Sequence, residues 1–335
     1  MNNVVSEFGL NSEQLQLLFS LQNYICLEDI SYETSQGLKK KKGAWWKEWR
    51  KASNDFLHSF NHDDPNSQRS ILKSHKELKP LIEKVRSSIP NNSTPFYLIL
   101  LECTLFIPYF PLGKEGKPLK IKYRVNENKE TLYEIAELLK VDLCYVDQYL
   151  SGYKTAIKGI TGFWPKVIGG ALVGTVLFVI SSGMLAPMIA APFAAAGLSG
   201  AAATSSGLAT LGGGAIAAGG FGMAGGTAVI IGGGALLGAT TGSFSGKLIA
   251  SSPKFTINQA AKLEVVMREI ALVAQKDVRM AQELILEQRK TLRAIEDQLF
   301  ELQTHGEQNE KKIKALKKSI QYLKKAIDRN QQVIQ

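Results

Sequence analysis

The glycine-rich segment 220–225 reads GFGMAG and matches the GxGxxG pattern, which in dinucleotide-binding proteins turns the chain around a pyrophosphate. That chemistry needs a strand before the glycines, a helix after them and an acidic residue about 20 positions further on. The next acidic residue is Glu264, and no run of Val and Ile precedes the glycines. A P-loop also fails, because Gly246 and Lys247 are followed by Leu248. We therefore expect no nucleotide cofactor.

A possible metal-binding group precedes Pro65. Asp55, His58 and His62 are three and four residues apart on an expected helix, with Asp63 adjacent, and such spacing can hold Zn²⁺. A single short cluster without a distant partner is more typical of a solvated polar face. The sequence therefore predicts no metal centre.

Glu102 and Cys103 lie inside the apolar run 95–113, which we expect to be a buried core element of the N-terminal domain and not a bilayer span. The segment holds no histidine, so we interpret the two residues as a satisfied pair in the core and not as a catalytic dyad. An alternative is that Glu102 acts as an acid trigger for membrane insertion. No other segment offers a nucleophile with its base, so we expect no enzymatic activity.

Charge is distributed very unevenly along the chain. Residues 167–246 contain no Lys, Arg, Asp, Glu or His and hold 21 of the 30 glycines. These glycines alternate with Ala, Ile, Leu, Val, Met and Phe, unlike those of a polar linker. A bilayer span needs about 20 apolar residues, so this apolar block has room for two spans or for four, which we divide as 167–185, 188–204, 208–224 and 227–246. We divide the chain into 1–160, 161–250 and 251–335.

Glycines four residues apart recur within the apolar block. In lipid such spacing lets helix backbones approach closely and gain van der Waals contact. We expect a glycine zipper in which these positions pack membrane helices: Gly170, Gly174, Gly222, Gly226, Gly234, Gly238, Gly242 and Gly246.

Aromatic and basic residues stand where interfacial anchors belong. Trp164 and Lys166 precede the apolar block and Lys247 follows it. Segment 39–51, KKKKGAWWKEWRK, suits a helix at an anionic membrane surface, and its candidate anchors are Trp45, Trp46 and Trp49. The alternative is that Trp45 and Trp49 are buried in the local core. We expect no nucleic-acid partner, because no nucleic-acid-binding signature accompanies the basic run.

The N-terminal part is predicted to be mainly helical. A helix is expected over 11–30 with an Asn11 or Ser12 cap, and 130–150 is expected to form two helices separated near Val141. Residues 119–125 alternate between apolar and basic side chains, which predicts a small β-hairpin.

Residues 256–335 carry a long 3,4 heptad pattern of apolar residues. Thr304, His305 and Gly306 favour a helical hairpin that turns there, and the rival is a continuous coiled coil with a hinge. We expect this segment to form homo-oligomers or to bind a protein partner. Its distal half, 307–335, has eight basic and three acidic residues, so its outer face is either solvated or in contact with anionic lipid.

The segments WPKVIGGALVGTVLF (164–178), GMLAPMIAAPFAAAGLSG (183–200) and GGGAIAAGGFGMAGG (212–226) carry a resemblance. They are similar to the Gly/Ala-rich membrane region of the hydrolase-linked transmembrane-and-coiled-coil proteins and to glycine-rich interferon-inducible membrane proteins. The chain has no GxSxG motif, so the hydrolase activity of the first family is not carried over. The layout also resembles that of α-helical pore-forming toxins.

The sequence as a whole predicts a mainly α protein: a helical N-terminal domain with a β-hairpin, a glycine-rich multi-helix membrane block and a C-terminal coiled-coil hairpin. We expect a toxin or defence effector that oligomerises and inserts 167–246 conditionally to permeabilise a bilayer, and that is soluble before insertion. Positive charge on both sides of the apolar block favours cytoplasmic termini and hence an even number of spans. The flanking lysines are Lys154, Lys158 and Lys166 before it and Lys247, Lys254 and Lys262 after it. The alternative is a constitutive membrane adaptor that recruits cytoplasmic partners.

Overall fold

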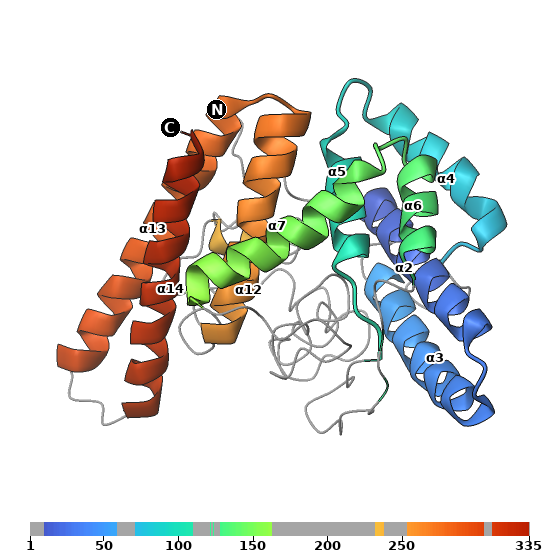
Figure 1. Cartoon of the computed structure of the whole chain (residues 1–335), viewed down its shortest axis with the longest axis horizontal. Helices are drawn as coiled ribbons and strands as arrows, with labels where there is room; N and C mark the ends of the chain where they lie inside the picture. The colour runs from blue at the N-terminus through green and yellow to red at the C-terminus, as the bar shows by residue number, and fades with distance from the viewer. Residues whose placement is uncertain are drawn as a thin grey trace.

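A computed structural model describes residues 10–58, 71–109, 121, 123, 128–162, 232–237, 253–304 and 310–334, and it is mainly helical (Figure 1). The described helices before the apolar block are α2 (Ser12–Tyr32), α3 (Gln36–His58), α4 (His75–Ser88), α5 (Thr94–Thr104), α6 (Lys129–Leu138) and α7 (Cys144–Thr161). Those within and after it are the 3₁₀ helix η4 (Gly234–Leu236), α12 (Pro253–Val265), the π-helix η5 (Val266–Ala274), α13 (Val278–Thr304) and α14 (Glu310–Ile334).

The start of α2 follows from its first residues. The Asn11 side chain accepts a hydrogen bond from the Gln14 backbone N–H, and the Gln14 side chain accepts one from the Asn11 N–H, both at 2.9 Å. This reciprocal cap satisfies two amide donors that a helix start leaves free. The helix expected over 11–30 is therefore confirmed, and so is the break between α6 and α7.

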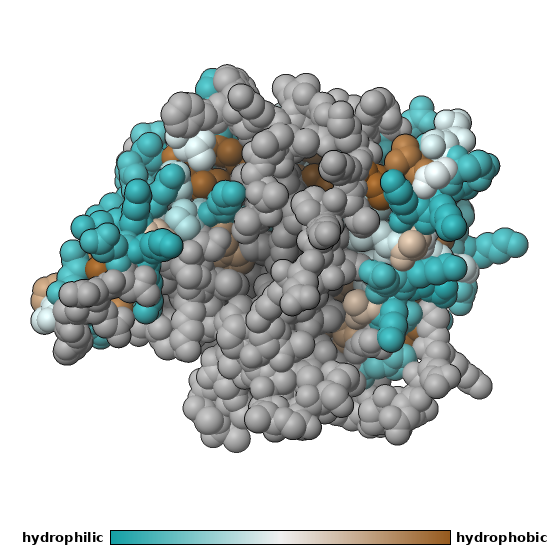
Figure 2. All heavy atoms as spheres, turned by 90° about the horizontal axis from the view of Figure 1, so that it is seen from below, coloured by the Kyte–Doolittle hydropathy of each residue, from teal (hydrophilic) through white to brown (hydrophobic). Residues whose placement is uncertain are grey.

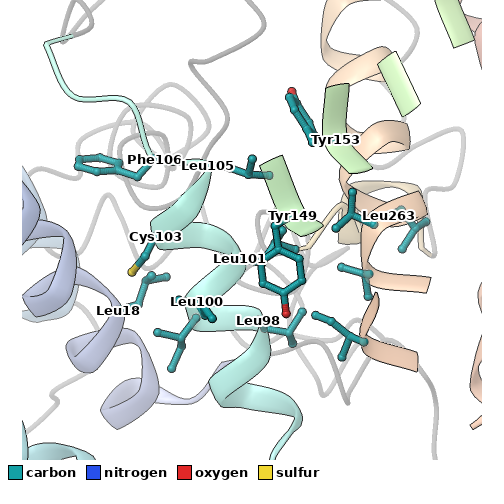
Figure 3. Close-up of a cluster of buried hydrophobic side chains, with 14 of the residues drawn as sticks. Leu18, Leu98, Leu100, Leu101, Cys103, Leu105, Phe106, Tyr149, Tyr153 and Leu263 are labelled. Carbon is teal, nitrogen blue, oxygen red and sulfur yellow. The ribbon is translucent and has the colours of Figure 1, made fainter. Parts of the chain in front are cut away.

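Helix α5 is the centre of the N-terminal core. Its residues from Thr94 to Thr104 are buried, with only Tyr97 partly exposed, as an apolar helix surrounded by other helices must be. Figure 3 shows α5 between Leu18 of α2 on one side and Tyr149 of α7 and Leu263 of α12 on the other. The run expected to be a buried core element thus packs against helices from both ends of the chain.

Helix α7 joins the two halves of the described structure. It crosses the middle of the molecule and packs against α5, α12 and α14 (Figure 1). It ends at Gly162, whose φ of +80° caps the helix in a left-handed conformation that glycine adopts without strain. The helices before the apolar block therefore share one core with those after it.

The C-terminal part forms a helical hairpin. Helix α13 ends at Thr304, and α14 returns along it from Glu310 (Figure 1). The hairpin is thus confirmed and the continuous coiled coil is wrong. The heptad pattern nevertheless does not form one helix from 256 to 304, because the chain leaves η5 through Lys276, with φ of +54°, before α13 begins.

The expected β-hairpin is not supported. No strand occurs among the residues that the structure describes, and Ile121 and Tyr123, the described positions of the alternating segment, have no regular secondary structure. Tyr123 is buried, and its ring lies 6.5 Å from that of Tyr109. The alternating pattern had predicted that Tyr123 lies on the apolar face of a strand. In the structure its contact with Tyr109 holds it in the core instead.

Most of the apolar block lies outside the described residues, including the expected spans 167–185, 188–204 and 208–224. In the fourth expected span, 227–246, residues 232–237 form a turn and η4, so the continuous helix expected there is wrong for this conformation. Among the described helices, none has both the length and the apolar character that a bilayer crossing requires.

Candidate functional site

Two oppositely charged residues meet in the core, where Glu102 of α5 faces Lys262 of α12. The Lys262 ammonium donates to both carboxylate oxygens, at 2.9 and 2.8 Å, and neither side chain has any exposed surface. An ion pair that is removed from water loses hydration that its mutual attraction only partly restores, so it persists only with good geometry. The two hydrogen bonds supply that geometry.

The end of the apolar block makes a third contact with this pair. The Gly232 backbone N–H donates to the Glu102 carboxylate at 2.8 Å. Gly232 and Gly233 have φ of +58° and +87°, so both adopt the left-handed conformation that favours glycine. The turn aims a backbone donor at the carboxylate, and the uncharged block is thereby tied to a charged group.

Gly233 brings this turn against the backbone of α12. A Cβ on Gly233 would lie 2.5 Å from the Gln259 carbonyl oxygen and 2.7 Å from the Leu263 amide nitrogen. Only a residue without a side chain permits this approach. Beyond the turn, the Leu236 carbonyl accepts a hydrogen bond of 2.7 Å from the Thr291 hydroxyl of α13.

We call Glu102, Lys262 and the Gly232–Gly233 turn the latch, because they join three separate parts of the chain. Loss of either charge would leave the other buried without its partner, which typically costs about 3–5 kcal/mol. Cys103, next to Glu102, is also buried, and burial together with the Glu102 charge raises the pKa of its thiol well above the ordinary value. The latch therefore suits a structural role, in which it holds three parts of the chain together. The raised pKa keeps Cys103 in its thiol form.

Helix α12 is buried on nearly all sides although it is rich in polar residues. Glu264 forms two hydrogen bonds with the Arg329 guanidinium of α14, at 2.9 and 2.5 Å, and Thr256 donates to Ser319 at 3.2 Å. Gly159 of α7 leaves room for that guanidinium, since a Cβ there would overlap it. Paired polar groups thus set the position of α12 between α7 and α14.

Of the eight glycines predicted to pack membrane helices, Gly234 is described. It is buried and begins η4, beside the latch. The other seven lie outside the described residues: Gly170, Gly174, Gly222, Gly226, Gly238, Gly242 and Gly246. The anchors Trp164, Lys166 and Lys247 also lie outside them.

The three tryptophans of segment 39–51 are on α3, and two of them face the core. Trp45 and Trp49 are buried, where Trp49 packs against Phe19 and Phe106. This is the packing of the core alternative, because Phe19 of α2 and Phe106 pack against Trp49, and Tyr109 packs against Trp45. Trp46 is partly exposed, and its Nε1–H donates to the Asn23 side chain at 2.8 Å.

The residues weighed as a candidate metal-binding group are only partly described. His58 ends α3, whereas His62 and Asp63 lie outside the described residues. Within the described ranges, no three His, Cys, Asp or Glu side chains gather closely enough to hold a metal ion.

Sequence reasoning missed the partner of Glu102. It placed Lys262 among the cations that flank a membrane segment, whereas the structure buries this lysine completely. A signal was present, because a carboxylate within an apolar helix needs a buried cation or donor. The sequence contains 40 basic residues, and nothing local distinguishes Lys262 among them.

Comparison with protein-family models, with curated proteins and with solved structures gives no match to this chain. The family resemblances of the apolar block therefore stay expectations.

Proposed function

We propose that this protein is a conditional membrane-inserting effector that permeabilises a bilayer, and that the latch holds its closed form. The observation that supports this proposal most strongly is the contact of the Gly232 N–H with Glu102, itself paired with Lys262. This contact ties the end of an 80-residue uncharged segment, 167–246, to the helices on both sides of it.

The protein and the lipid bilayer offer the apolar block two competing environments. The apolar block contains enough apolar residues for two bilayer spans or for four. Its many glycines lack the side-chain methylenes that would each add about 0.8 kcal/mol of burial in lipid, so its preference for lipid is weak for its length. A weak preference allows protein contacts to retain it, and opening the latch shifts the balance toward the bilayer.

The test is dye release from lipid vesicles by the full chain, with Glu102→Gln and Lys262→Met as variants that open the latch. We expect each to release dye faster than the unmodified protein. The double variant Glu102→Leu/Lys262→Met removes both buried charges but leaves the Gly232 N–H without its acceptor, so it should release dye more slowly than either single variant and faster than the unmodified protein.

General loss of stability must be separated from opening of the latch. Leu132→Ala, at a buried position of α6, is expected to destabilise the fold by about 2–5 kcal/mol without touching the latch. It should leave dye release unchanged at temperatures where it stays folded. If no variant releases dye while the unmodified chain resists carbonate extraction from membranes, the constitutive adaptor replaces this proposal.

A further inference from the structure

The positive charge of the protein is concentrated in two helices. Helix α3 has seven Lys and Arg against two acidic residues, and α14 has eight against two. Together the two helices have a surplus of eleven positive charges, which exceeds the formal net charge of +10 for the whole chain. The other residues together are therefore close to neutral, and any electrostatic attraction to an anionic partner is centred on α3 and α14.

On α14 the lysines form a stripe on the outer face. Lys311, Lys314, Lys318 and Lys325 are exposed and follow one another at three, four and seven residues, a spacing that keeps them on one side of a helix. The opposite side of α14 is buried through Leu316, Ile320, Leu323 and Ile327. The stripe thus faces away from the hairpin core.

Helix α3 has the same arrangement. Lys40, Lys47 and Lys51 are exposed at seven- and four-residue spacing, opposite the buried Trp45 and Trp49. Exposed Glu48 is the acidic residue beside this stripe.

Each basic helix has an exposed aromatic residue near its first turn. Tyr32, at the end of α2 and just before α3, is 71% exposed, and so is Phe300, in the last turns of α13 before α14. Lysines next to an aromatic ring are the combination that binds at the headgroup level of a bilayer. The exposed acidic residues near Phe300 are Asp297, Glu301 and Glu310.

The two basic regions stand on one side of the molecule. In Figure 1 the connection from α2 to α3 and the joined ends of α13 and α14 lie at the lower right and lower left. Figure 2 looks at that side and shows hydrophilic side chains gathered at its left and right, over α13–α14 and over α2–α3. Both regions therefore lie toward the same side of the molecule.

We propose that the lysine stripes of α3 and α14, with Tyr32 and Phe300, dock the protein on an anionic bilayer surface. This inference deepens the proposed function, because insertion of 167–246 must start from a membrane-bound state. Docking itself requires only the folded, latched protein. Docking is therefore measured on its own, as binding of the unmodified protein to vesicles without dye release.

The experiment measures cosedimentation of the full chain with vesicles of phosphatidylcholine alone and with vesicles that contain about 30% phosphatidylserine. We expect binding to the anionic vesicles only, weakening as salt rises because exposed charges are screened. Each lysine near an anionic surface strengthens binding about fivefold. Lys314→Glu/Lys318→Glu on α14 and Lys40→Glu/Lys47→Glu on α3 should each weaken it by at least about 25-fold.

The matched control is Lys76→Glu/Lys79→Glu, which makes the same charge change at exposed positions of α4. Helix α4 lies at the upper right of Figure 1, away from the two basic regions, so binding should weaken far less. Tyr32→Ser/Phe300→Ser tests the aromatic contribution at unchanged charge and should also weaken binding.

The outcomes separate docking from permeabilisation. Salt-sensitive, stripe-dependent binding of the unmodified protein supports docking, and the proposed function is contradicted if Glu102→Gln and Lys262→Met bind in the same way and release no dye. Equal binding to, or equal dye release from, neutral and anionic vesicles overturns docking while leaving permeabilisation intact. Stripe-dependent retention by an RNA of mixed sequence, with no vesicle binding, also overturns docking on lipid.

Discussion

The Glu102 carboxylate and the Lys262 ammonium lie 2.8 Å apart with neither side chain exposed, although 160 positions separate them in the chain. Glu102 precedes the uncharged segment 167–246 and Lys262 follows it. The pair therefore closes the fold around the segment that we propose to enter the membrane, and the Gly232 N–H attaches that segment to the pair.

Glu102→Gln should lower the free energy of unfolding by about 3–5 kcal/mol, because Lys262 would stay buried opposite a neutral amide. Urea unfolding followed by circular dichroism measures the change. Lys140→Met breaks the exposed pair between Lys140 and Glu83 and should change stability by less than about 1 kcal/mol. Equal effects of the two substitutions would contradict a special role for the buried pair.

Gly233→Ala should destabilise the closed form by about 2–4 kcal/mol, since the new Cβ combines a left-handed backbone with overlap against α12. Gly43→Ala is the matched control. Nothing lies within 4 Å of a Cβ there, and alanine favours the interior of a helix such as α3 by about 0.5–1 kcal/mol. Hydrogen exchange at the α12 amides should accelerate in the first variant and stay unchanged in the second.

Arg329→Lys should destabilise the packing of α14 on α12 by about 1–2 kcal/mol although the charge is kept. The guanidinium holds both oxygens of the Glu264 carboxylate, and a lysine offers one point of contact. Thermal unfolding measures the loss. Arg293→Lys changes an exposed arginine of α13 in the same way, and a similar loss there would contradict the argument.

Tyr145 makes stability depend on pH in the alkaline range. Burial raises the pKa of its hydroxyl from the ordinary 10.0 to about 12. A group whose pKa is higher in the folded than in the unfolded protein contributes fully to stability at pH values below the unfolded-state pKa. That contribution to stability is lost as pH rises through the folded-state pKa. Tyr145→Phe should therefore flatten the fall of stability between pH 10 and 12 in urea unfolding.

Local sequence signals were sufficient for several helices. Asn11 and Gln14 form the cap that begins α2, and the apolar run around Glu102 forms the buried helix α5. The distal heptads and Gly306 predicted the helical hairpin of α13 and α14. These features depend on side-chain spacing and on capping, which act within a few residues.

Helix α12 shows why other features were not predictable. Its Thr256, Gln259, Lys262 and Glu264 are typical of a half-exposed helix, yet all four are buried. The alternating segment around Tyr123 likewise predicted a strand, and a core contact with Tyr109 holds that side chain instead. Trp45 and Trp49 of α3 are suited both to a membrane surface and to a core, and only the covering helices decide between them.

The sequence by itself determined that this is a mainly helical protein with a long uncharged, glycine-rich segment and basic residues on both sides of it. Spacing, capping and composition are local properties, so they can be read without coordinates. Only the tertiary structure decided which charges are buried together and which glycine approaches a helix backbone. Pairing of Glu102 with Lys262 depends on folding that brings distant helices together, because the attraction becomes decisive only after water has been excluded from both groups.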